Sequence, residues 1–211
     1  MDRFRLPRVY ALTDVQLSGL THAEQTRLLA LGGASLIQLR EKHLSGREFY
    51  EEAKAALAMA RQNGVQLIIN DQLDVALALR AHGVHLGQDD LSPESARALL
   101  EDTAILGYST HNVDQAVAAI KLPIDYLAIG PIFPTTTKAD TSPVLGLEGL
   151  RAVRRAIGEF PLVAIGGITH TNARSVIDAG ADSVAVISAL LSDPTRITEM
   201  TQSLIQFLPT R

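Results

Sequence analysis

Residues 162–187 read LVAIGGITHTNARSVIDAGADSVAVI, in which two short apolar segments flank a longer polar one. The apolar segments, Leu162 to Ile165 and Ser183 to Ile187, have the length and the β-branched content of buried strands. The segment Thr171 to Ala179 between them has helical spacing and runs into Gly180, a residue suited to a helix C-cap. Parallel strands need such a crossover helix, so this stretch predicts one unit of an α/β fold.

The same alternation of strand and helix recurs along the chain. Six further strands are expected, at Val9 to Thr13, Ser35 to Arg40, Gln66 to Ile69, Gly83 to Leu86, Ala104 to Tyr108 and Tyr126 to Ile129. Eight strand-helix units close naturally into a barrel, so we predict fold class α/β, a single (β/α)8 TIM barrel, with one catalytic domain over residues 1–211. An open doubly wound sheet is the alternative, because the number of strands does not prove closure.

Two further helices are clear from their spacing. They are Gly46 to Arg61 and Thr195 to Phe207. The first should bury one face, which consists of Phe49, Ala53, Ala56, Leu57 and Ala60. Glycines that follow helices, at Asn63-Gly64 and His82-Gly83 as well as at Gly180, are predicted to be C-caps.

Composition excludes several classes of protein. The chain has 211 residues, a formal net charge of -4, 4% aromatic residues and no Trp, and its Lys and Arg residues are scattered, so we expect no nucleic acid partner. It has no Cys, which excludes disulfides and thiolate sites. Residues 1–9 are charged and no apolar stretch is long enough to cross a bilayer, so we expect a cytoplasmic protein without a membrane partner. The oligomeric state is not indicated.

Polar residues gather after the predicted strands, where barrel active sites are built. After the second strand, Gln38, Arg40 and Lys42 alternate and would point to one side if the chain stays extended. The alternative is a charged rim in which Arg40 and Glu41 are solvated.

Carboxylates follow the third and fourth strands. Asp71 comes directly after Asn70, and Asp90 ends the segment Gly87-Gln88-Asp89-Asp90. Two carboxylates with a substrate phosphate are the usual ligands of Mg²⁺ in such sites. Alternatively, both aspartates are N-caps of the helices that follow.

The remaining strand ends are suited to phosphate binding. Ser109 and Thr110 follow the fifth strand and would either contact a phosphate or cap the next helix. After the sixth strand, a long loop from Gly130 to about Gly146 carries Lys138. This loop either closes over a substrate or is a surface loop without a function. After the seventh strand, Gly166-Gly167 would let a phosphate approach the backbone, unless the pair only makes a turn.

Together these motifs resemble the thiamine-phosphate synthase family, over nearly the whole chain. The resemblance is carried, in order, by Gln38-Leu39-Arg40-Glu41-Lys42, Ile69-Asn70-Asp71, Gly87-Gln88-Asp89-Asp90, Gly130-Pro131-Ile132-Phe133-Pro134-Thr135 and Ile165-Gly166-Gly167-Ile168. It implies a transferase of thiamine biosynthesis that joins hydroxymethylpyrimidine diphosphate to thiazole phosphate, releasing pyrophosphate, with Mg²⁺ as cofactor.

The resemblance also implies a role for each matching position. Asp71 and Asp90 would hold Mg²⁺, and Arg40, Lys42, Ser109 and Lys138 would be catalytic. The pyrimidine diphosphate would be bound by Gln38, Arg40, Lys42, Asn70, Ser109 and Lys138, and the thiazole phosphate by Thr135, Thr137, Gly167, Ile187 and Ser188. The expected substrate-binding set also contains Leu39, Glu41 and Thr136.

Two other functions remain open at this point. A thiazole tautomerase on a similar barrel would use a histidine such as His111 as its acid or base, although His111 would more simply face solvent in the first turn of a helix. A non-catalytic sensor of a phosphorylated ligand would have lost charged site residues, which this chain retains. His82 and His85 invite a metal site, but core or rim packing explains their spacing better.

Overall fold

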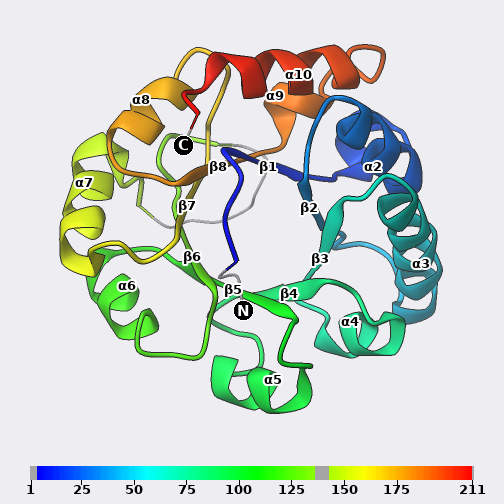
Figure 1. Ribbon diagram of the computed structural model, residues 1–211, viewed down its shortest axis with the longest axis horizontal. Helices are drawn as coiled ribbons and strands as arrows, with labels where there is room; N and C mark the ends of the chain where they lie inside the picture. The colour runs from blue at the N-terminus through cyan, green and yellow to red at the C-terminus, as the bar shows by residue number, and fades with distance from the viewer. Residues whose placement is uncertain (1–3, 136–142, 211) are drawn as a thin grey trace.

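A computed structural model describes residues 4–135 and 143–210, and these form a closed barrel of eight parallel strands (Figure 1). The strands pair in chain order and β8 closes on β1, where Val9 lies opposite Val184. Their bounds are β1 Val9–Leu12, β2 Leu36–Leu39, β3 Gln66–Asn70, β4 Gly83–Leu86, β5 Ile105–Thr110, β6 Tyr126–Ile129, β7 Leu162–Ile165 and β8 Ser183–Val186. Closure confirms the barrel and rules out the open sheet.

The helices form an outer ring around the strands (Figure 1). Their bounds are α1 Val15–Ser18, α2 His22–Leu31, α3 Gly46–Gln62, α4 Leu73–Leu79, α5 Pro93–Leu99, α6 Val113–Ala119, α7 Gly146–Ile157, α8 Ala173–Asp178, α9 Ser188–Leu191 and α10 Ile197–Phe207. No helix in the described part of the chain combines the length and the apolar character that a bilayer crossing requires.

Most sequence expectations on the elements are confirmed. The predicted strands agree with the observed ones to within two residues at each end, and the buried residues of α3 are the predicted five. The predicted C-cap glycines are only partly right: α3 and α8 are capped by Asn63 and Ala179, and Gly64 and Gly180 follow these caps with positive φ values. At the third position the prediction is wrong, since α4 ends at Arg80 in the left-handed conformation and Gly83 is already in β4. Position 83 requires glycine for another reason, because a Cβ there would lie 2.1 Å from the Ile105 carbonyl oxygen of the neighbouring strand.

The amino ends of the strands are closed by buried side chains and by paired charges. The chain before β1 crosses this end of the barrel (Figure 1), where the Phe4 ring lies 6.1 Å from that of Tyr126. Asp182, just before β8, accepts hydrogen bonds from Arg154 at 2.7 Å and from the Leu162 amide at 2.9 Å. This end is therefore built for stability, which leaves the carboxyl ends of the strands for the site.

Candidate active site

A cavity of about 700 Å³ opens at the carboxyl ends of β1 to β5. We call it the main cavity. Its lining is polar, with charged groups of both signs, and consists of Asp14, Val15, Gln16, Arg40, Glu41, Lys42, His43, Asn70, Asp71, His85, Gly87, Gln88, Asp89, Asp90, Ser109 and His111. Residues after five different strands thus face one space, as the sequence predicted for Arg40, Lys42, Asp71 and Asp90.

Arg40 is a half-buried cation in the wall of the main cavity. Its side chain is 14% exposed, and Nη1 lies 3.9 Å from an Asp14 carboxylate oxygen. Its Nε is buried and, within the described part of the chain, has no hydrogen-bond partner. A buried donor without an acceptor is costly unless a ligand supplies one, so Arg40 suits an anion. The interpretation of Arg40 and Glu41 as a solvated rim is wrong, since the Glu41 side chain is only 6% exposed.

Asp71 and Lys42 form an ion pair at the mouth of the cavity. Asp71 has a φ of 62°, which is uncommon for a residue other than glycine and turns the chain directly after β3. The N-cap of α4 is Gln72, so Asp71 does not cap that helix. Its carboxylate instead faces the segment after β2.

Asp90 lies beside Asp71 and likewise caps no helix. It accepts a hydrogen bond from the Gly87 amide at 2.7 Å, whereas α5 is capped by Ser92. Burial raises the pKa of Asp90, and the Asp71 carboxylate raises it further through its charge and a hydrogen bond. Two carboxylates this close favour a cation between them.

The floor of the main cavity is a hydrogen-bonded chain of side chains inside the barrel. Ser109 Oγ lies 2.8 Å from His85 Nε2, and His85 Nδ1 lies 3.0 Å from the Tyr126 hydroxyl. That hydroxyl lies 2.9 Å from the Tyr10 hydroxyl, which accepts a bond from Gln38 Nε2 at 3.1 Å. Five strands contribute one residue each to this floor. Burial raises the pKa of both tyrosines, so both hydroxyls stay protonated and can donate hydrogen bonds.

Gly107 makes room for this floor. A Cβ at Gly107 would lie 2.1 Å from Tyr126 Cζ and 2.5 Å from His85 Nδ1. A side chain at this position of β5 would therefore displace the two residues that join the floor together.

Sequence comparison gives the family of the chain. The family model described as thiamine monophosphate synthase matches residues 9–190, from β1 to α9. The chain belongs to this family.

Members of the thiamine monophosphate synthase family resemble the chain over most of its length. The thiamine-phosphate synthase of Koribacter versatilis is 50% identical over 208 residues, covering 95% of this chain and 97% of that protein. The one from Chloroflexus aurantiacus is 47% identical, with 88% and 85% covered. Among solved structures, thiamine phosphate pyrophosphorylase from Pyrococcus furiosus superposes with a TM-score of 0.85 at 36% identity, covering 95% of this chain and 94% of that one.

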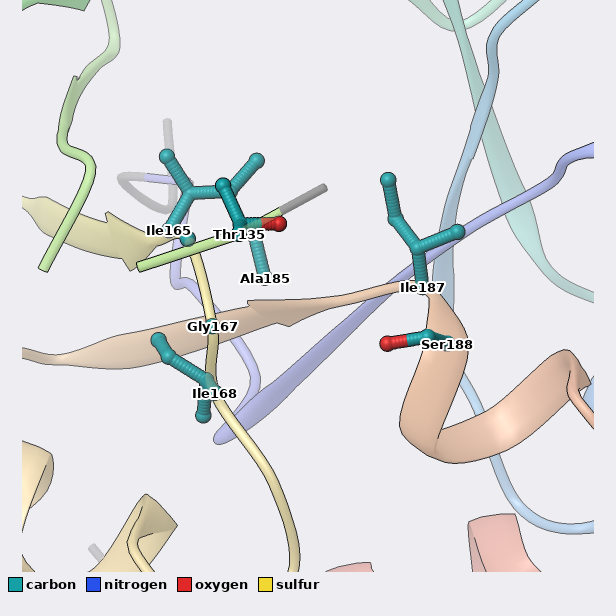
Figure 2. Close-up of a pocket in the computed structure, with 8 residues that line it drawn as sticks. Thr135, Ile165, Gly167, Ile168, Ala185, Ile187 and Ser188 are labelled. Atoms are coloured by element: carbon teal, nitrogen blue, oxygen red, sulfur yellow. The ribbon is translucent and has the colours of Figure 1, made fainter. Parts of the chain in front are cut away.

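In this member of the thiamine monophosphate synthase family, a second, smaller pocket lies at the ends of β7 and β8. We call it the glycine pocket; it is lined by Thr135, Ile165, Gly166, Gly167, Ile168, Ala185, Ile187 and Ser188. Figure 2 shows the Thr135 and Ser188 hydroxyls on facing sides of it, with Gly167 on the loop after β7. Gly167 has a φ of 63°, and a Cβ there would lie 2.5 Å from the Pro134 carbonyl oxygen, so the backbone needs glycine at this close approach.

The two pockets are neighbours. A third hollow of about 720 Å³ is lined by Asp14 and Gln16, which also line the main cavity, and by Thr135, Gly167 and Ser188, which also line the glycine pocket. The mouth of the barrel thus offers two adjoining places for small molecules, one beside cations and carboxylates and one beside the glycine turn after β7.

The other predicted site residues differ in their placement. Asn70 and Ser109 face the main cavity, but both lie within their strands: Asn70 is the last residue of β3, and Ser109 is the fifth residue of β5. Ser109 and Thr110 do not cap α6, because the N-cap of that helix is Asn112. Leu39 is fully buried in β2. Thr136, Thr137 and Lys138 lie outside the described residues.

Sequence reasoning missed several polar residues that the barrel brings to the site. His85 was expected to pack in the core or rim, which is confirmed by its burial, but it also reaches the main cavity. Asp14 and His22 were not named as site residues, and neither lies on a strand. The available signal was a polar or aromatic side chain at an alternate position of a buried strand, such as Tyr10 or His85, because every second residue of a barrel strand points inward.

Proposed function

We propose that the chain joins hydroxymethylpyrimidine diphosphate to thiazole phosphate in an Mg²⁺-dependent, dissociative displacement that yields thiamine phosphate and pyrophosphate. Residues 1–211 would act as one catalytic domain in the cytoplasm. The carrying observation is the arrangement of the main cavity, in which the unsatisfied Arg40 Nε lies in the same wall as the Lys42, Asp71 and Asp90 side chains. Family membership supports the same reaction.

The diphosphate would lie against Arg40 and Lys42. Arg40 offers a buried donor and a fixed positive charge, and Lys42 can leave Asp71 for a phosphate oxygen, because its side chain is long, flexible and 48% exposed. Lys138 would add a third cation. These groups stabilise the charge that grows on the departing diphosphate, which is where a catalyst of this reaction gains most.

The residues also fit a magnesium ion. Among the described residues, no group of three or more His, Cys, Asp or Glu side chains is arranged to hold a metal. Asp71 and Asp90 would supply two oxygen ligands, and the substrate phosphates would supply others, which is the usual arrangement for Mg²⁺. When bound, the ion neutralises charge on the diphosphate.

No side chain is required as a nucleophile. The thiazole nitrogen carries its own lone pair, and the aminopyrimidine ring can donate electrons to a cationic methylene as the bond to the diphosphate breaks. Ser109 and Gln38, the two ends of the floor, would hold the pyrimidine, and their hydrogen bonds to His85 and Tyr10 fix their orientation. The glycine pocket would take the thiazole phosphate, through the Gly167 and Ser188 backbone and the Thr135 hydroxyl.

Pyrophosphate release tests the proposal. Release that requires both substrates and Mg²⁺ supports the synthase, whereas binding of the substrates without turnover would support a sensor. Asp71→Asn should keep the fold and lower turnover ~10-fold to 1000-fold, with part of the loss recovered at high Mg²⁺, since the change removes one charge from the metal site. Full turnover by a folded Asp71→Asn protein would exclude Asp71 as a ligand. A rate that does not fall with electron-withdrawing pyrimidine substituents would argue against the dissociative route.

A tautomerase is the second candidate, and the position of His111 is the observation that favours it. His111 lies before α6 and lines the main cavity, so the expectation of a solvent-facing residue in the first helical turn is wrong. Its Nδ1, however, lies 2.9 Å from the Gly130 carbonyl oxygen, which fixes the ring. His111→Asn should leave pyrophosphate release nearly unchanged if the chain is a synthase; loss of proton exchange on thiazole phosphate in that variant would support a tautomerase.

A further inference from the structure

His22 is a buried histidine outside the main cavity that no step above uses. It is the first residue of α2 and its side chain is fully buried. Nδ1 lies 2.8 Å from the Thr13 hydroxyl, and Nε2 lies 3.4 Å from a carboxylate oxygen of Glu41. Both ring nitrogens thus contact residues next to the cations of the site.

The two partners of His22 hold the backbone of the segment that carries Arg40 and Lys42. Thr13 Oγ1 accepts a hydrogen bond from the Arg40 amide at 3.3 Å. The second Glu41 oxygen accepts bonds from the amides of Lys42 at 2.7 Å and of His43 at 2.6 Å. The Glu41 carboxylate is therefore held by backbone amides of its own loop and by His22. These contacts explain how a carboxylate can be buried next to a cavity that suits an anion.

The donors and acceptors of this arrangement match if the imidazole is neutral with its proton on Nε2. Nε2 then donates to Glu41, and Nδ1 accepts from the Thr13 hydroxyl, whose other acceptor, the Gln38 carbonyl, is farther away at 3.4 Å. Thr13 Oγ1 keeps a lone pair for the Arg40 amide. Burial lowers the pKa of His22, which agrees with a neutral ring.

We propose that His22 is a positioning residue that clamps residues 40–43 from behind, through Thr13 on one side and Glu41 on the other, and so presents the Arg40 and Lys42 side chains to the diphosphate. In this arrangement Glu41 does not touch the substrate. The inference rests on the proposed function, because it assumes that the diphosphate lies against Arg40. A small shift of such a segment is enough to weaken binding and catalysis, since charged contacts depend steeply on geometry.

Two substitutions break the same link from opposite sides. His22→Asn keeps an acceptor near Thr13 but does not reach Glu41. Glu41→Gln keeps its shape and can still accept from the Lys42 amide, but it turns an amide donor toward the Nε2 donor of His22. Each variant should weaken the binding of Mg²⁺-pyrophosphate, measured by calorimetry, and raise the KM for the pyrimidine diphosphate by about 5-fold to 20-fold. The KM for thiazole phosphate should stay within about twofold of wild type, because its site is at β7 and β8.

The double variant separates a clamp from a direct contact. If His22 acts through Glu41, the double variant should bind pyrophosphate no more weakly than the worse single variant, because the link is already broken. Effects that multiply would mean that Glu41 acts independently and would overturn the inference, as would wild-type pyrophosphate binding in either folded single variant. Glu41→Gln decides the matter if His22→Asn does not fold.

Two controls complete the experiment. His82→Asn removes another histidine, whose ring accepts a hydrogen bond from the Leu67 amide at the opposite end of the barrel. This variant should leave pyrophosphate binding unchanged. Arg40→Ala should weaken that binding more than either clamp variant. If Arg40→Ala binds pyrophosphate as wild type does, the proposed site itself is wrong and the inference falls with it; if only the clamp variants bind normally, the inference alone is wrong.

Discussion

Arg40→Ala is the most direct perturbation of the main cavity, because it removes a half-buried charge and a donor without an acceptor. Arg40 Nη1 already lies 3.9 Å from one carboxylate oxygen, so a phosphate oxygen in the same cavity can approach to a comparable distance. Two unit charges about 4 Å apart interact by ~4 kcal/mol at the effective dielectric near a protein surface. If half of the leaving charge has developed in the transition state, the loss is ~2 kcal/mol, or about 30-fold in kcat.

The assay for Arg40→Ala is pyrophosphate release at saturating substrates, with kcat and KM determined separately for each substrate. The expected result is a fall of about 30-fold in kcat together with a higher KM for the pyrimidine diphosphate, because the ground-state diphosphate also loses a contact. Arg174→Ala is the matched control, since Arg174 pairs with Asp178 on the exposed side of α8 and should change neither constant. A folded Arg40→Ala protein with a kcat within threefold of wild type would refute the electrostatic role of this side chain.

Three further predictions concern stability. Tyr126→Phe should lower the free energy of unfolding by ~1–3 kcal/mol in urea titrations, since it removes the hydroxyl that joins Tyr10 to His85; an unchanged midpoint would show that the floor adds no stability. Asp182→Asn should cost a similar ~1–3 kcal/mol without changing the KM for either substrate, because its partners are at the amino ends of the strands; a change confined to KM would contradict this. Burial lowers the pKa of His22 and of His82, so the folded chain takes up these protons less readily than the unfolded chain. Their contribution to stability is complete above the unfolded pKa of about 6.5 and is lost as the pH falls below it. The unfolding free energy should therefore drop between pH 7.5 and 5.5, and less steeply in His22→Asn; equal slopes would argue against a neutral His22.

Local patterns predicted the barrel well, because strand and helix periods are properties of neighbouring residues. The buried face of α3 could be read from five apolar positions, and three of the eight strands have the expected bounds at both ends. The C-cap at Gly83 failed for a tertiary reason, since its lack of a side chain serves a contact with β5 and not the end of a helix.

The candidate site could be predicted only as a set of strand ends. Placing Asp71 and Asp90 after neighbouring strands was enough to bring them together, because the carboxyl ends of parallel strands share one mouth. Their roles as caps or ligands could not be separated, since both depend on where a short side chain turns. Only the structure shows that neither is a cap, because the N-caps of α4 and α5 are Gln72 and Ser92.

The amino-acid pattern alone establishes an alternation of strands and helices and the polar character of the segments that follow the strands. Both are local, because they depend on side-chain period and on turn-forming residues. Barrel closure decides which polar atoms meet: it joins Tyr10, His85 and Tyr126 from three strands into one floor, and it directs His22 toward the segment behind Arg40. Such pairings depend on burial and on distances between residues far apart in the chain, and these exist only once the cylinder has formed.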